Sequence, residues 1–265
     1  MQCSPYHNRY KIQHKTCFSK DQLVQIMKSI GMKHTNTKKQ DMWNIINTHM
    51  FYKCGSNNEH CWLKNINKQF DAHVPKQPVT WEQNQYTWLS NFDILNVMIQ
   101  YEKKYPYFKF FGVLPIDFAE TYGMSRCISE EICNINLSKF KQFKQFGCVF
   151  NLDKHYQSGS HWVSIFFNTD KSKSNYGFHF FDSTSFKIPV AILNFGKAIK
   201  KQINDPSFRI YQNVVRKQFK NTECGMFSLH FIIECLNNKP FIEIVNDRFY
   251  DEHVHELRNK LFRKE

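Results

Sequence analysis

The chain has 265 residues, of which 42% are hydrophobic, so it can bury an ordinary core as one large domain or two small ones, and a disordered chain is excluded. No apolar stretch approaches the roughly 20 residues of a membrane-spanning helix, which predicts a soluble protein without a membrane partner. The net charge of +13 favours polyanions such as nucleic acid, although it specifies no sequence or groove.

The N-terminal residues lack the apolar segment of a secretory signal, which indicates a reducing compartment. The nine cysteines are therefore expected to be core fillers, metal ligands or nucleophiles rather than disulfides. Cys54 and Cys61, with His49 and His60 nearby, match no standard zinc-finger spacing, so no metal site is assigned.

The first 80 residues carry much of the charge, with 12 lysines and arginines against 4 acidic residues. Ser19 and Gln22 have capping-box spacing ahead of apolar residues at helical intervals, and a second helical pattern covers residues 42–50. A segment with two prolines and no apolar periodicity spans residues 72–85. We therefore expect a basic helical N-terminal arm, residues 1–80, and a second domain, residues 81–265.

The second domain alternates helix-like and strand-like segments. A helix is expected over residues 90–106, capped by Ser90 or Asn91, with Phe92, Leu95, Met98 and Ile99 on one face. Residues 148–154, 161–170 and 175–183 predict three antiparallel strands joined by polar turns. A helix at 190–203, a strand at 208–215 and a buried helix at 223–236 complete an α+β fold.

Three residues of this domain have the chemistry of a thiol protease. Cys224 stands where the buried helix begins, and the positive end of a helix favours the reactive thiolate. His161 opens a predicted strand, where its imidazole could take a proton from the nucleophile. Asp182 ends the next strand and could orient that ring, although a histidine or aspartate at such a position is more often a surface residue or a turn cap.

The residues around Cys224 also suggest an oxyanion hole. Gly225 would let a substrate carbonyl approach the backbone N–H groups at the start of the helix. Gln218, six residues before Cys224, could supply a side-chain amide donor, and Asn221 is a rival for the same role. The sequence leaves this choice open.

These motifs resemble the adenain-like cysteine proteases, which include the ubiquitin-like-protein-specific proteases and viral polyprotein proteases. The resemblance is carried by GSHW at 159–162, FFDS at 180–183, and Gln218 followed by NTECGMFSL at 221–229. WLSNFDI at 88–94 is similar to the segment that leads into a helix in that family. The likeness is strongest to the polyprotein proteases of asfarviruses and other nucleocytoplasmic large DNA viruses.

The resemblance implies a mixed sheet flanked by helices, with the nucleophile at a helix N-terminus and a helical N-terminal arm. It implies a Cys224–His161–Asp182 triad that needs no cofactor or metal, and cleavage after Gly-Gly in viral structural polyproteins. Trp88 and Trp162 would clasp the diglycine, because two indole faces leave no room for a Cβ. Such an enzyme would act in viral factories of the host cytoplasm and in the virion during core maturation.

Other functions compete with this interpretation. The same tunnel and thiol would serve to remove a ubiquitin-like modifier, and bacterial acyltransferases share the triad. In a different class, the protein could chiefly bind nucleic acid, non-specific DNA for example, through the basic arm on a protease-like scaffold. None of the nine glycines is adjacent to another, so the chain should not process itself at a Gly-Gly site.

Overall fold

The computed structural model describes residues 3–6, 16–33, 37–122 and 126–264. The chain forms two compact units, the first of residues 1–77 with 260–265 and the second of residues 78–259. The division expected at residue 80 thus differs at the C-terminus, where the last six residues belong with the first unit. Residues 34–36, between the first two expected helices, lie outside the described residues.

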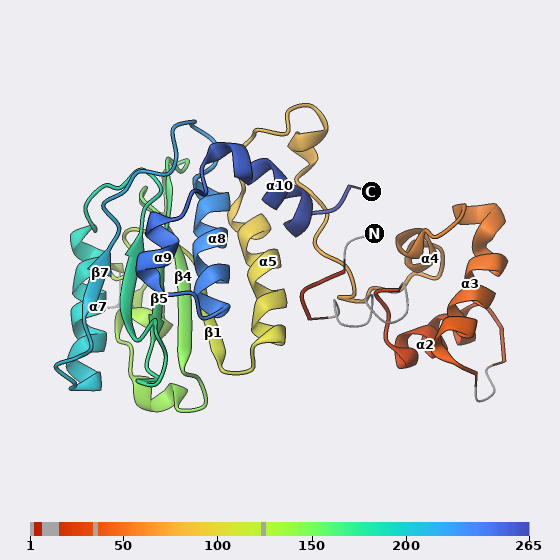
Figure 1. Ribbon diagram of the computed structural model, residues 1–265, viewed down its shortest axis with the longest axis horizontal. Helices are drawn as coiled ribbons and strands as arrows, with labels where there is room; N and C mark the ends of the chain where they lie inside the picture. The colour runs from red at the N-terminus through yellow and green to blue at the C-terminus, as the bar shows by residue number, and fades with distance from the viewer. Residues whose placement is uncertain (1–2, 7–15, 34–36, 123–125, 265) are drawn as a thin grey trace. The chain divides into compact units, whose positions relative to one another are not determined.

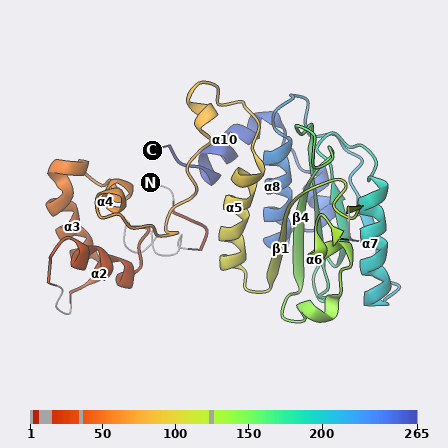
Figure 2. The ribbon, with the colours of Figure 1, turned by 180° about the vertical axis from the view of Figure 1, so that it is seen from behind.

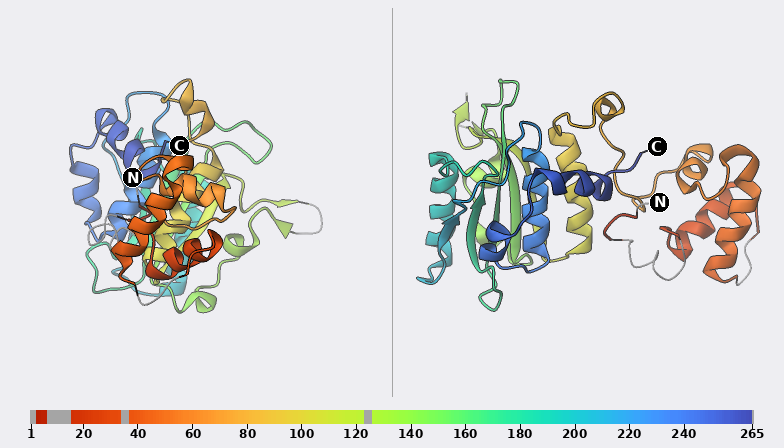
Figure 3. Two further views of the ribbon diagram at one scale, coloured as in Figure 1. Left: turned by 90° about the vertical axis from the view of Figure 1, so that its right-hand side faces the viewer. Right: turned by 45° about the horizontal axis from the view of Figure 1, so that its top comes forward.

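Among its described residues the first unit has the helices α2 (Lys20–Ser29), α3 (Lys39–Cys54) and α4 (Glu59–Asn65), shown in Figure 3. The predicted capping box is present, because the Ser19 side chain accepts from the Gln22 N–H and the Gln22 side chain accepts from the Ser19 N–H. Apolar side chains of the three helices share one core, which includes Ile26, Ile46 and Trp62.

A five-stranded mixed sheet forms the centre of the second unit. The strands are β1 (Phe108–Pro115), β4 (Gln145–Asn151), β5 (Trp162–Asn168), β6 (Gly177–Phe181) and β7 (Ile210–Gln212), in the order β1-β4-β5-β6-β7. The pairs β4–β5 and β5–β6 are antiparallel, which confirms the predicted meander, whereas both edge strands pair in parallel. The α+β fold class is confirmed.

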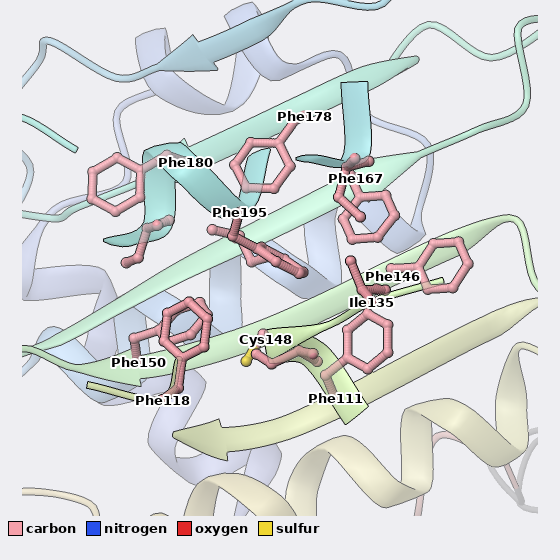
Figure 4. Close-up of a cluster of buried hydrophobic side chains, with 14 of the residues drawn as sticks. Phe111, Phe118, Ile135, Phe146, Cys148, Phe150, Phe167, Phe178, Phe180 and Phe195 are labelled. Atoms are coloured by element: carbon pink, nitrogen blue, oxygen red, sulfur yellow. The ribbon is translucent and has the colours of Figure 1, made fainter. Parts of the chain in front are cut away.

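Helices cover both faces of this sheet (Figures 1 and 2). On one face lie α5 (Asn91–Lys104) and α8 (Cys224–Leu236), and on the other lies α7 (Val190–Ile203). Between the sheet and α7 is a core dominated by phenylalanine rings (Figure 4). Phe146 and Phe167, paired across β4 and β5, stack with ring centroids 4.5 Å apart, and Phe195 of α7 packs edge-on against Phe167.

Shorter elements connect these layers. They are η1 (Val79–Glu82), the hairpin of β2 (Thr121–Tyr122) and β3 (Arg126–Cys127), α6 (Glu130–Cys133), η2 (Leu137–Phe140), α9 (Phe241–Asn246) and α10 (Asp251–Leu261). Within the described ranges, no helix combines the length and apolarity needed to cross a membrane.

The expectation that the cysteines are unpaired is wrong for six of the nine. Disulfides join Cys3 to Cys17, Cys54 to Cys61 and Cys127 to Cys133, across Cα–Cα distances of 5.1, 5.6 and 6.4 Å. These Cα–Cα distances are within the range for a disulfide. They depend on the fold, so the spacing of the cysteines in the sequence does not predict them. The free thiols are those of Cys148, Cys224 and Cys235.

Candidate active site

His161 and Asp182 meet at one edge of the sheet. His161 directly precedes β5 and Asp182 directly follows β6, and because these strands are antiparallel the two residues lie at the same end of the pair. His161 Nε2 is 2.7 Å from Asp182 Oδ1. The His161 side chain is 16% exposed and that of Asp182 only 1%, so little solvent screens this interaction.

Several donors fix the Asp182 carboxylate. The N–H and the hydroxyl of Thr184 both donate to Oδ1 at 2.8 Å, and the Phe186 N–H donates to Oδ2 at 3.2 Å. Asn213, after β7, holds the backbone of Asp182 by accepting from its N–H at 2.8 Å and donating to its carbonyl at 2.7 Å. The carboxylate is therefore held in place beside the imidazole before any substrate arrives.

Cys224 completes the group. It is the first residue of α8 and is buried, and it lies close enough to His161 to raise the pKa of that imidazole. Nε2 of His161 is engaged by Asp182, which leaves Nδ1 as the ring nitrogen available to the thiol. One imidazole thus joins the sulfur and the carboxylate, as the predicted triad requires.

The electrostatics of this group favour a charged imidazole. Burial lowers the pKa of His161, but hydrogen bonds and charge interactions with Asp182 and Cys224 outweigh burial and raise the pKa to about 9. Burial opposes ionisation of Asp182, yet the hydrogen bond from His161 leads a set of contacts that lower its pKa. By contrast, burial in the core raises the pKa of Cys148 and Cys235 well above the usual range, which keeps them as inert thiols.

The two candidate amide donors have different surroundings. Gln218 is buried, its Oε1 accepts from the Ser183 hydroxyl at 2.6 Å, and its Nε2 donates to the Lys220 carbonyl at 2.6 Å. One N–H hydrogen of that amide is left over for another acceptor. Asn221 is exposed, and its side chain has no hydrogen bond within the part of the chain that the structure describes.

Trp162, Leu89 and Gly225 are closely packed beside the nucleophile. The indole N–H of Trp162 donates to the Leu89 carbonyl at 3.0 Å, which ties the start of β5 to the segment that carries Trp88. A Cβ on Gly225 would lie 3.2 Å from side-chain atoms of both Trp162 and Leu89. Glycine at 225 therefore allows this close packing, in addition to the predicted approach of a substrate. Trp162 is buried, whereas Trp88 is 40% exposed.

Sequence reasoning missed the residues that hold the segment before Cys224. Asp251, at the start of α10, accepts from the N–H groups of Phe219 at 2.7 Å and Lys220 at 3.1 Å. Arg258, also in α10, binds Glu223. In the sequence, Asp251 and Arg258 appear only as charged residues of a helix. Their partners lie more than 30 positions away, so no local pattern identifies them.

Comparison with known proteins connects this site to viral proteases. No family model matches the chain. The R355 protein of Acanthamoeba polyphaga mimivirus, a proposed thiol protease, is 28% identical over 99% of this chain and 93% of its own length. The SUMO-1 cysteine protease S273R of African swine fever virus is 30% identical over 125 residues, which are 44% of this chain and 44% of S273R.

The comparison with solved structures also identifies a viral protease. A crystal structure of the African swine fever virus pS273R protease superimposes with a TM-score of 0.68, at 21% identity, over 100% of this chain and 96% of that one. The superposition confirms the fold expected from the motifs, and the sequence matches agree with the family resemblance. The chain is thus related by sequence to viral thiol proteases and has the fold of pS273R.

Proposed function

We propose that the protein is an endopeptidase that cuts polyproteins after a Gly-Gly pair, with Cys224 as nucleophile, His161 as acid and base, and Asp182 as the orienting carboxylate. The observation that carries the proposal is the single imidazole of His161, whose Nε2 is 2.7 Å from Asp182 Oδ1 and whose pKa is raised by both Asp182 and Cys224. This arrangement is the minimum for thiol-dependent acyl transfer.

The reaction follows from the order of the contacts. The Cys224 sulfur attacks the carbonyl carbon of the second glycine, and the oxygen takes up negative charge while amide donors stabilise it. His161, charged at neutral pH, then gives its proton to the leaving amine as the C–N bond breaks, which leaves a thioester on Cys224. Water adds to the thioester, His161 takes a proton from that water, and the freed thiolate returns to its pair with the imidazolium.

Steric crowding supports the choice of glycine. Trp162 and Leu89 pack against Gly225, the residue after the nucleophile, and the exposed indole of Trp88 adjoins Leu89 in the chain. A glycine needs the least room between two indoles, because it has no Cβ. We propose that Trp88 and Trp162 contact the substrate diglycine.

A panel of matched substrates tests this specificity. We expect a Gly-Gly-Xaa peptide to be cleaved, and replacement of either glycine by alanine to lower kcat/KM by roughly 10- to 200-fold. Cys224→Ala should abolish cleavage and serves as the control for contaminating proteases. Equal cleavage of the glycine and alanine peptides would contradict the Gly-Gly assignment.

The biological substrates we propose are viral core polyproteins, cut in the viral factory of the host cytoplasm and in the virion, because the relatives by sequence are viral proteases. A ubiquitin-like modifier is the second candidate, because S273R is named a SUMO-1 cysteine protease. A SUMO fusion and a ubiquitin fusion, assayed beside a core polyprotein with Gly-Gly junctions, separate the two. Faster turnover of a modifier fusion than of the polyprotein would favour deconjugation.

Non-specific DNA is a second proposed partner, because the first 80 residues carry 12 basic against 4 acidic side chains. Counterion release would make such binding weaken steeply as salt rises. We expect Cys224→Ala to keep DNA affinity while losing cleavage, as measured by fluorescence anisotropy over a salt series. Absence of binding at low salt would remove DNA from the account and leave the protease assignment untouched.

A further inference from the structure

A buried carboxylate organises the first unit. Glu59, the first residue of α4, is 1% exposed, and its Oε1 accepts from the Trp43 indole at 2.6 Å and from the Thr16 hydroxyl. Its Oε2 accepts from the Cys17 N–H at 3.3 Å and lies 3.0 Å from Nε2 of His73. Two donors thus hold one oxygen in place, while the other is directed toward a cysteine and a histidine.

These residues form a group of metal-ligand atoms outside the protease site. The Cys17 sulfur, a Glu59 carboxylate oxygen and a His73 ring nitrogen all lie within 4.8 Å of one another. Cys3 is bonded to Cys17 and so adds a second sulfur to the same place. All four side chains are buried, with exposures of 0% to 9%, so the group is shielded from bulk water.

We propose that Cys3, Cys17, His73 and Glu59 bind a zinc ion when the Cys3–Cys17 disulfide is reduced. Two thiolates, an imidazole and a carboxylate are donors that zinc accepts, and four protein donors give the closed tetrahedral shell of a structural site. Donors at about 2.0–2.3 Å from one tetrahedral ion lie roughly 3.5 Å apart, a separation that small side-chain rotations would reach here. The hydrogen bonds from Trp43 and Thr16 would orient the Glu59 ligand.

A thiol reductant converts the disulfide form of the site into the form that binds zinc. Two reductant thiols reduce the Cys3–Cys17 bond, which yields two protein thiols and the reductant's disulfide. Zinc then binds as both thiols lose their protons, and the Nε2 hydrogen bond between His73 and Glu59 gives way to coordination. Disulfide and zinc are therefore alternative cross-links at one place.

The location explains what the site would do. The four ligands come from positions 3, 17, 59 and 73, so zinc would join the N-terminal segment to α4 and to the chain that follows it, whereas the disulfide joins only positions 3 and 17. A unit of this size has a small core, so one cross-link adds substantially to its stability. The inference concerns the stability of the first unit and does not depend on the Gly-Gly proposal.

Metal analysis of the full-length chain tests the site. The protein is reduced with dithiothreitol, exchanged into zinc under nitrogen, desalted and measured by elemental mass spectrometry. We expect one bound zinc ion per chain in the reduced protein and none after oxidation of the cysteines. Zinc should raise the melting temperature of the reduced protein, and a chelator should reverse that rise.

Matched variants identify the ligands. Zinc should be lost in Cys3→Ser/Cys17→Ser and in His73→Gln, and kept in Cys54→Ser/Cys61→Ser, because that second disulfide of the unit belongs to no group of three donors among the described residues. If a ligand variant fails to fold, cobalt replaces zinc in the unmutated reduced chain, where thiolate-to-cobalt absorption reports sulfur ligation. Absence of stoichiometric metal, absence of the sulfur band, or zinc that survives loss of Cys3 and Cys17 would each overturn the proposal.

Discussion

Arg258 binds Glu223, the residue immediately before the nucleophile, through Nε at 3.0 Å and Nη2 at 2.5 Å. Both side chains are 3% exposed, and the guanidinium also lies over the Trp81 ring, 4.3 Å from its centroid. A weaker contact reaches the carbonyl of Thr87, next to Trp88. Arg258 therefore connects α10 to the start of α8 and to the segment that carries Trp88.

We expect Arg258→Met to lower the free energy of unfolding by about 3–5 kcal/mol, because it leaves the Glu223 carboxylate buried without its partner. Urea denaturation followed by tryptophan fluorescence measures the change. The double variant Glu223→Gln/Arg258→Met should recover part of the loss, because no unpaired charge remains. A single variant as stable as the unmutated protein would show that the pair does not brace the site.

The alkaline limb of activity should report His161. Burial lowers the pKa of this group, but Asp182 and Cys224 raise it to about 9, above its ordinary 6.5. Since the imidazolium is the form that protonates the leaving amine, kcat/KM should fall as the pH rises through about 9. The raised pKa also means that protonation stabilises the folded state fully below pH 6.5, and that this contribution is lost as the pH passes about 9.

Asp182→Asn should move that limb to lower pH, because the largest contact that raises the pKa of His161 is weakened. The pH dependence of kcat/KM on a Gly-Gly peptide, recorded for both proteins, checks the direction. An alkaline limb that stays in place in the variant would mean that Asp182 does not set the protonation of His161.

Asp251 should act as a positioning residue for the segment that carries Gln218. Its carboxylate holds two successive N–H groups, so Asp251→Ala should loosen that segment and lower kcat by up to about 100-fold with a small change in KM. Steady-state kinetics on the Gly-Gly peptide provide the measurement. Asp170→Ala is the matched control, because Asp170 also accepts a backbone N–H, that of Ser172, but lies beyond the other end of β5. Equal kinetic losses in the two variants would argue against a local effect.

The amide donors can be separated by alanine variants. We expect Gln218→Ala to lower kcat by about 10²- to 10³-fold through loss of an oxyanion donor, with KM little changed. Asn221→Ala, at an exposed position, should leave both the stability and kcat close to those of the unmutated protein. The reverse order of losses in kcat would assign the donor role to Asn221.

Much of the fold was predictable because its strands and buried helix have strong local patterns. The three central strands are apolar runs bounded by polar turns, and α8 begins at Cys224 as expected. The edge strand β1 was not predicted. The apolar face expected for α5 is wrong for Phe92 and Ile99, which are 69% and 37% exposed. Apolar residues occur around much of this helix, so periodicity alone did not select the face with Ile94 and Val97.

Only part of the candidate site could be predicted from the sequence. The ends of two adjacent antiparallel strands must meet, so the approach of His161 to Asp182 follows from the strand order. Asp251 and Arg258 contact the segment before Cys224 across 32 and 35 positions, and only the packing of α10 brings them there. The disulfides were missed for the same reason, since their formation depends on Cα distances set by the fold.

The most direct test of the central claim is covalent labelling with a peptide that ends in Gly-Gly and an electrophile, followed by mass spectrometry of the modified residue. The account predicts one adduct, on Cys224, whose formation slows sharply in His161→Ala while the variant stays folded. An adduct on Cys148 or Cys235, or labelling of Cys224 at the same rate without the imidazole, would contradict it.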